Sequence, residues 1–399
     1  MQHNNEENIE SFYTLVENQT QFEEFINIHK NVTWLTFDTE FIGEKRYEVL
    51  LCLIQVMSEF GVFIIDTLKI EDISKFNTIL CDPEVLKVTH SGYNDLKIFY
   101  QKYKTLPKNI FDTQIAASFI GYKYPISFQN LVEGELNISI KKAYTVTKWD
   151  VRPIEKQQMQ YAYEDVFYLK GIWDSLTQKL TDCNRLAWAI DECKCFENED
   201  LYNINFESEY YAIRGLQDLS KKNKLLLYRA LLWRNDEAKR KNISKEMVLP
   251  FKLLFTIASQ FHLGNKILNQ NRHLQAHTFE KYAPTFDRLL EAPMTKEEEN
   301  IIRNIPTLKK VIDPKANLIL GFLKNYIEWN CLEKNIAVDL LFRNDTLKNL
   351  NTHNIKEDEL NIDGWRKEII GAETIHLFKN SKSLHITPLV DGFQLQIKK

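Results

Sequence analysis

The stretch Thr33-Trp34-Leu35-Thr36-Phe37-Asp38-Thr39-Glu40-Phe41 decides how the rest of the chain is interpreted. Its β-branched and aromatic residues and its alternating polarity predict a strand. Because side chains on a strand alternate between two faces, Asp38 and Glu40 share one face. Two acids this close at the end of a buried strand are costly unless a positive group binds them, which favours a divalent cation. An edge strand with two solvated acids is the alternative that this stretch leaves open.

The composition is that of a globular protein with more than one domain. The chain has 399 residues, 44% hydrophobic and 27% charged, a length that predicts two or three domains. Its six cysteines form no CxxC pair, which predicts a reducing, cytoplasmic location without structural zinc. No apolar run reaches the length of a signal or membrane-spanning segment. The net charge of -4 means that a nucleic-acid partner must be held by local basic patches or by bound metal.

The pattern over residues 11–180 predicts a mixed α/β layout with a partly parallel sheet. Three strand-like runs in succession, at 33–41, 49–57 and 61–66, favour an antiparallel meander. A first strand is expected at 13–16 and a short apolar strand at 86–90. Helices are predicted from an N-cap at Thr20 to residue 30, at 72–80, 95–103, 112–121 and 127–136, and from Pro153 to about residue 180.

The second half of the chain is different, because strand-like alternation gives way to helical periods after about Asp200. We therefore expect three domains, at 1–200, 201–295 and 296–399, with a β-hairpin at the end of the third around Asp391-Gly392. Residues 214–241 hold nine basic residues against three acidic ones, which indicates either a positive binding face or a solvated helix surface.

Two further acids extend the first pair. Asp95 follows the strand at 86–90 and begins a helix, so it should lie at an edge of the sheet. Tyr161 and Asp165 are four residues apart and share one helix face. Each is weak evidence alone, since acids on exposed helices are common. Together with Asp38 and Glu40 they form an oxygen-only ligand set, which suits two ions of Mg²⁺ or Mn²⁺.

These motifs resemble ribonuclease D, in the tyrosine-containing DEDD exonuclease superfamily. The resemblance lies in Phe37-Asp38-Thr39-Glu40-Phe41, in the segment from His90 to Asp95, and in Tyr161-x-x-x-Asp165. Intervening runs also match, namely residues 51–55, Phe111-Asp112-Thr113-Gln114, and Trp149 with Arg152-Pro153. It extends over about residues 34–180. A departure follows the first motif, where the family often has a Tyr-x-Pro-like run and this chain has Tyr47-Glu48-Val49.

The resemblance implies a ribonuclease-H-like exonuclease domain with a mixed sheet, followed by an all-α region similar to HRDC modules. The first HRDC-like run is at 233–238, and a fainter second one combines 331–341 with Gly364-Trp365-Arg366. The implied activity is 3′-to-5′ hydrolysis of RNA ends by two divalent cations, in the processing of tRNA or other structured RNA. We expect no membrane association, and the sequence makes no obligate protein partner evident.

The resemblance also assigns roles at the site. Asp38, Glu40 and Asp165 would hold the ion near the attacking water, Asp38 and Asp95 would serve a second ion beside the leaving 3′ oxygen, and Tyr161 would orient the water. Three residues are candidates for substrate contact, each with a structural alternative. They are Phe41, which would stack on a base or fill the core; His90, which would touch RNA or cap a strand; and Arg152, which would bind a phosphate or remain a surface charge.

Two other functions remain open from sequence. One is a DNA 3′-to-5′ exonuclease, because a metal site acting on the phosphodiester need not sense the 2′-hydroxyl. The other is a non-catalytic RNA-binding scaffold that keeps only the fold. The complete set of four mutually repelling acids disfavours the scaffold, since they cost stability when no cation is bound among them.

Overall fold

The computed structural model describes residues 12–140, 148–203, 205–264, 275–306, 314–341, 364–371, 384–389 and 392–397. Contacts divide the chain into two units. One comprises Met1–Glu40, Leu53–Tyr202 and Lys309–Lys399, and the other comprises Phe41–Cys52 and Asn203–Leu308. Within the described ranges, none of the helices combines the length and hydropathy that a membrane crossing requires.

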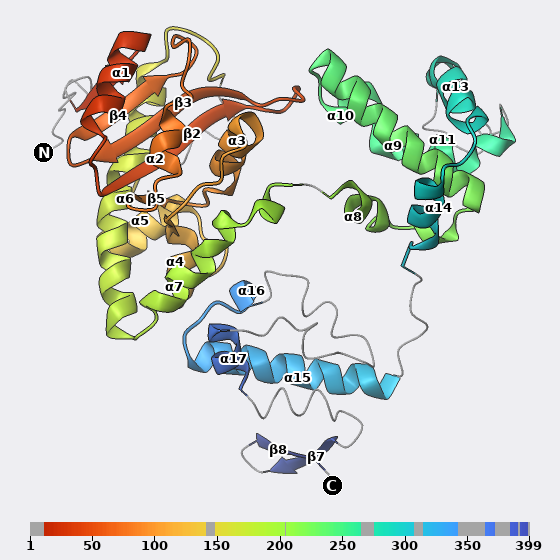
Figure 1. The fold of residues 1–399 in the computed structure, drawn as a ribbon. Coiled ribbons are helices and arrows are strands. Elements are labelled where there is room, and N and C mark those ends of the chain that lie inside the picture. Colours follow the sequence, from red (N-terminus) through yellow and green to blue (C-terminus); the bar gives the residue numbers. More distant parts are fainter. Residues whose placement is uncertain are drawn as a thin grey trace, which may run out of the picture. The chain divides into compact units, whose positions relative to one another are not determined.

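A mixed six-stranded sheet lies at the centre of the first unit (Figure 1). The strand order is β1-β4-β3-β2-β5-β6, so the three strands predicted in succession are neighbours. β3 and β4 pair antiparallel, whereas β1 runs parallel to β4, and β5 runs parallel to both β2 and β6. The predicted mixed α/β fold is thereby confirmed. The strands are β1 (Tyr13–Val16), β2 (Trp34–Ile42), β3 (Leu50–Ser58), β4 (Gly61–Asp66), β5 (Leu86–Thr89) and β6 (Ile110–Asp112).

Helices pack on this sheet, and the longest is α6, which contacts β4 and β5 (Figure 1). A capping box between Glu155 and Gln158 begins α6, and buried residues such as Val166 and Leu169 form its apolar stripe. The first seven helices are α1 (Gln19–Ile28), α2 (Phe76–Leu80), α3 (Tyr93–Tyr103), α4 (Thr113–Ser118), α5 (Phe128–Leu136), α6 (Lys156–Asp182) and α7 (Leu186–Cys193).

Three local predictions differ from the structure. Asn18, not Thr20, caps α1, because its side chain accepts the Gln21 N–H. α2 is shorter than predicted, since Asp72 instead accepts from the backbone and hydroxyl of Ser74 and forms a turn before the helix. Strand β6 was not predicted, and Asp112, the first residue of the helix predicted at 112–121, ends this strand and caps α4.

The second unit is helical and has its own core. α9 lies at its centre and contacts α10, α11, α13 and α14. Buried residues such as Leu226, Ile257 and Phe286 fill this core, and Tyr47 from the segment between β2 and β3 packs against it. The helices are α8 (Phe206–Tyr211), α9 (Lys221–Lys241), α10 (Lys245–Val248), α11 (Phe251–Gln260), α13 (Ala276–Glu291) and α14 (Lys296–Arg303).

The C-terminal helices α15 (Pro314–Glu333), α16 (Val338–Leu341) and α17 (Trp365–Ile370) belong to the first unit. Glu192 of α7 accepts the indole N–H of Trp365 at 3.0 Å and two hydrogen bonds from Arg366 at 2.6 and 2.8 Å. The Trp365 ring packs edge-on against Phe119 at 4.8 Å between centroids. The chain ends in β7 (Leu384–Leu389) paired antiparallel with β8 (Gly392–Ile397), and Asp391 of the expected turn lies outside the described residues.

Replacing Glu192 with Ala should therefore lower the free energy of unfolding by about 3 kcal/mol, because it leaves the half-buried Arg366 charge and the buried Trp365 indole N–H without their partner. Urea denaturation of the full chain measures this change. The matched control is Asp191→Ala, which breaks the exposed ion pair with Lys194 and should change stability by less than about 1 kcal/mol. Equal losses in the two variants would contradict the importance of this contact.

Candidate active site

β2 presents Asp38 and Glu40 toward helix α6. Thr36, Asp38 and Glu40 alternate along the strand, and the Thr36 hydroxyl donates to the carbonyl oxygen of Val166 on α6 at 2.9 Å. This contact fixes which face of β2 meets α6. Asp165 directly precedes Val166, so it comes close to the two acids of the strand.

The three carboxylates of Asp38, Glu40 and Asp165 form one cluster. Each offers an oxygen, and these oxygens lie within 4.8 Å of one another. Asp165 is buried, and its Oδ2 has no hydrogen-bond partner among the residues that the structure describes. Tyr161 lies one helical turn before Asp165, and its hydroxyl donates to the Asp165 carboxylate.

The fourth acid, Asp95, lies in the first turn of α3 and is buried, with 6% of its surface exposed. The hydroxyl of Thr39, between Asp38 and Glu40 in sequence, donates to its Oδ1. Asp95 lies outside the three-carboxylate cluster, but its charge acts on the cluster, because it helps to raise the pKa of Asp38.

Burial raises the pKa of every acid at this site, and repulsion from other site acids adds to the rise at Asp38, Glu40 and Asp165. Burial raises the pKa of Glu40 from 4.5 to about 9, with further contributions from Asp165 and Asp95. It raises the pKa of Asp165 to about 8 and that of Asp95 to about 6. Burial, followed by the charges of the other three acids, also raises the pKa of Asp38 well above its ordinary value.

The cluster fits a divalent cation. A buried carboxylate oxygen without a hydrogen-bond partner and two further carboxylates beside it form a site that a positive charge would stabilise. The ligand atoms are all oxygens, the donors that Mg²⁺ and Mn²⁺ prefer.

Known proteins show the same organisation. The family described as 3'-5' exonuclease matches residues 13–181. The ribonuclease D of Sphingobium indicum is 30% identical over 353 residues, which cover 86% of this chain and 89% of that protein. The chain belongs to the ribonuclease D family. The ribonuclease D of Granulibacter bethesdensis is 28% identical over 368 residues, which cover 91% of each protein. As a member of this family, the chain is a 3′-5′ exoribonuclease.

A solved structure gives the same picture of the fold. The crystal structure of Escherichia coli RNase D, described as an exoribonuclease involved in structured RNA processing, matches with a TM-score of 0.77 and 24% identity. The match covers 92% of this chain and 98% of that one. The ribonuclease-H-like exonuclease fold with a helical C-terminal region, predicted from sequence, is thus confirmed.

The structure places the three candidate substrate residues in different surroundings. Phe41 is half-buried at the end of β2. His90 lies between two internal partners, with Nδ1 3.0 Å from the Thr113 hydroxyl and Nε2 3.1 Å from the Ile126 carbonyl oxygen. Burial lowers the pKa of His90. Contact of these residues with RNA stays a prediction.

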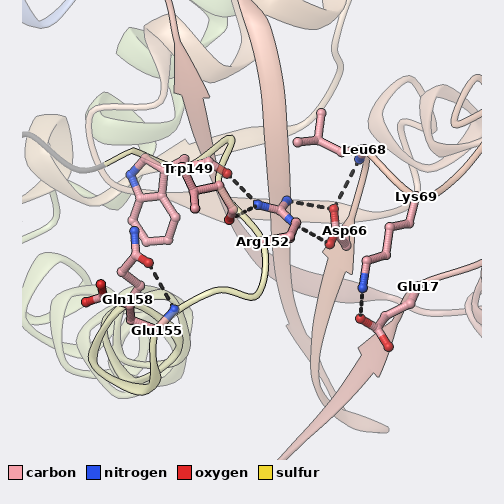
Figure 2. A network of polar contacts seen from close by, with 9 residues as sticks. Glu17, Asp66, Leu68, Lys69, Trp149, Arg152, Glu155 and Gln158 are labelled. Atoms are coloured by element: carbon pink, nitrogen blue, oxygen red, sulfur yellow. Dashed lines mark hydrogen bonds and ion pairs between the residues drawn. The ribbon is translucent and has the colours of Figure 1, made fainter.

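Arg152 lies in a polar network beside the start of α6 (Figure 2). Its guanidinium binds both carboxylate oxygens of Asp66 and the carbonyl oxygens of Trp149 and Val151. These contacts hold the half-buried Arg152 against Asp66 and the segment before α6, so the geometry supports a structural role, and the predicted phosphate contact stays a prediction.

Sequence reasoning assigned no role to Asp112, although its run was part of the family resemblance. The Asp112 carboxylate accepts the backbone N–H groups of Ser91 and Gly92 at 3.2 and 3.0 Å, and it also caps α4. It therefore holds the turn before α3, the helix that carries Asp95. A Cβ at Gly92 would collide with Thr89, so this turn requires glycine.

The basic residues of α9 are less available for binding a nucleic acid than their number in the sequence suggested. Arg229 and Arg234 are buried, and Arg229 forms an ion pair with Glu298. Lys221 pairs with Glu299, and both Arg240 and Lys241 pair with Glu237. Lys222 and Lys239 are exposed and have no ion-pair partner among the described residues.

We expect the stabilisation of this protein by Mg²⁺ to increase between about pH 6 and about pH 9. Glu40 and Asp165, with pKa values raised to about 9 and about 8, keep protons in the folded, metal-free protein that the unfolded chain has already lost. The contribution of these two groups to the stability of the metal-free protein therefore falls as pH rises through this range. Over the same range a cation competes with fewer protons for the carboxylates.

Thermal unfolding with Mg²⁺ and with chelator, compared at each pH, measures this effect. Taking the difference between the two curves removes the pH dependence that comes from buried groups outside the site. Lys87 is such a group, because burial lowers its pKa to about 8. Asp38→Asn should reduce the difference at every pH. A gain from Mg²⁺ that is independent of pH would contradict the assignment of these acids as ligands.

Proposed function

We propose that this chain removes nucleotides from the 3′ end of RNA with two divalent cations, Mg²⁺ or Mn²⁺, held by its four site acids. The observation that carries this proposal is the cluster of three carboxylate oxygens within 4.8 Å, in which the Asp165 Oδ2 has no hydrogen-bond partner among the described residues. Membership of the ribonuclease D family supplies the activity that such a cluster would serve.

The acids divide into two overlapping ligand sets. Asp38, Glu40 and Asp165 would hold one cation, and Asp38 together with Asp95 would hold the second. When bound, the two ions supply an activated water for attack and stabilise negative charge on the leaving 3′ oxygen. Asp38 is the shared ligand, and the Thr39 hydroxyl keeps Asp95 oriented beside it.

Tyr161 would orient the attacking water by hydrogen bonding. Burial, and then the charges of Asp165, Glu40 and Asp38, raise the pKa of its phenol above the ordinary value. The phenol therefore stays protonated at neutral pH and acts as a donor and acceptor rather than as a general base. Its position on α6, four residues before Asp165, puts the hydroxyl beside a proposed metal ligand.

The substrate we propose is structured RNA with a free 3′ end, such as a tRNA precursor. Support comes from the description of Escherichia coli RNase D as involved in structured RNA processing. The HRDC-like helical unit would contact the body of the RNA through exposed cations on α9 such as Lys222 and Lys239, which form no ion pair with the described residues. A cytoplasmic location agrees with the free state of the cysteines.

Asp38→Asn should abolish cleavage while leaving the fold intact. Removing one charge relieves repulsion in the metal-free site, so thermal stability in chelator should hold or rise. The assay uses 5′-labelled RNA and a DNA of matched sequence, with Mg²⁺, with Mn²⁺ or with chelator.

The wild-type chain should shorten RNA progressively with either metal and leave it intact in chelator. DNA shortened as fast as RNA would indicate a DNA exonuclease instead. RNA bound but left uncut under every condition would indicate a scaffold. Unfolding of the Asp38→Asn variant in circular dichroism would contradict a purely catalytic role for Asp38.

Tyr161→Phe should bind metal normally but cleave about 10²- to 10⁴-fold more slowly, because only the hydroxyl that positions the water is lost. Single-turnover kinetics at saturating RNA give this rate. Tyr163→Phe is the matched control, since Tyr163 lies on the same helix and stacks on Phe167. A wild-type rate for Tyr161→Phe would remove the hydroxyl from the mechanism.

A further inference from the structure

Asp66 and Arg152 form an internal ion pair that joins strand β4 to the segment before α6 (Figure 2). Arg152 Nε lies 2.6 Å from one carboxylate oxygen of Asp66, and its Nη2 lies 2.7 Å from the other. The Asp66 side chain is 2% exposed and that of Arg152 is 19% exposed. Such a two-point contact fixes the plane of the guanidinium as well as its position.

The same guanidinium holds the backbone that precedes α6. Its Nη1 donates to the carbonyl oxygens of Trp149 at 2.6 Å and Val151 at 3.0 Å. A few residues later, the capping box of Glu155 and Gln158 begins the helix. The segment from Trp149 to Val151 is therefore tied to β4 through one side chain.

Trp149 connects this anchor to the catalytic helix. It is 4% exposed, and its ring centroid lies 6.2 Å from that of Tyr161, with the planes at 35°. The indole therefore packs along one side of the phenol. A shift of Trp149 would give the Tyr161 ring room to rotate, and the hydroxyl would then lose its fixed place beside Asp165.

We infer that the Asp66–Arg152 ion pair is a positioning device for Tyr161, acting through Trp149. The inference rests on the role proposed for the Tyr161 hydroxyl. A positioning ion pair differs from a merely stabilising one in one respect. Its loss should slow the chemical step only while the Tyr161 hydroxyl is present. The observed hydrogen-bond partners Asp66, Trp149 and Val151 are not among the proposed metal ligands.

The test combines Arg152→Lys with Tyr161→Phe. Lysine keeps the charge but cannot make the two-point contact with Asp66 and also reach both carbonyl oxygens. Arg152→Lys alone should lower the single-turnover rate at saturating RNA by about 10-fold or more, within the range expected for a positioned hydroxyl. In the Tyr161→Phe background the same substitution should have no further effect.

Two measurements exclude a general disturbance of the fold. Mn²⁺ affinity, followed by electron paramagnetic resonance, should be unchanged in Arg152→Lys, because the carboxylate cluster does not depend on this anchor. Arg366→Lys is the matched control, since Arg366 makes the same kind of two-point contact with buried Glu192 away from the proposed catalytic residues. It should lower thermal stability without changing the rate. Asp66→Asn serves as a second variant where Arg152→Lys folds poorly.

Three results would overturn the inference: a wild-type rate for both anchor variants, an effect of Arg152→Lys that is the same in the two backgrounds, or weakened Mn²⁺ binding. A wild-type rate for Tyr161→Phe would overturn it together with the role of Tyr161. By contrast, slow Tyr161→Phe combined with additive anchor effects would leave the proposed function standing and remove only this inference.

Discussion

Repulsion among four neighbouring carboxylates, two of them buried and two half-buried, is the constraint on which the catalytic unit depends. Asp38, Glu40 and Asp165 hold oxygens within 4.8 Å of one another, and burial raises the pKa of all three. Such a cluster tends to separate or protonate unless the surrounding structure holds it together. The fold does so with hydrogen bonds between elements: Thr36 binds β2 to α6, and Thr39 binds Asp95 to β2.

Local geometry explains why the residues of the candidate site could be predicted from the sequence. The two-residue period of a strand places Asp38 and Glu40 together, and the four-residue spacing of a helix does the same for Tyr161 and Asp165. These rules need no knowledge of the tertiary fold. What joined the two pairs was the family resemblance, since no local pattern states that α6 lies against β2. The mixed sheet was also predictable in outline, because the alternation along each strand is a local pattern.

Long-range contacts mark the limit of that reasoning. Arg152 was assigned to a phosphate or to the surface, because its partner Asp66 is 86 residues away in sequence. The three-residue strand β6 was not predicted, and its last residue, Asp112, was assigned to the start of a helix. Asp112, which ends β6, holds the turn before α3 from outside that helix. Arg152 and Asp112 each bind backbone groups or a charge of a segment that is distant in the sequence.

A count of charges along one helix also misses partners that are distant in the sequence. The acids that neutralise much of α9, Glu298 and Glu299, come from α14, more than sixty positions later in the chain. Arg229 therefore serves the core of the helical unit instead of RNA. Because most exposed cations of α9 are already in ion pairs, this helix would release few counterions on binding, and its electrostatic contribution to affinity would change little with salt. The chain's overall acidity points the same way, so retention of RNA should depend substantially on the 3′ end held at the metal cluster.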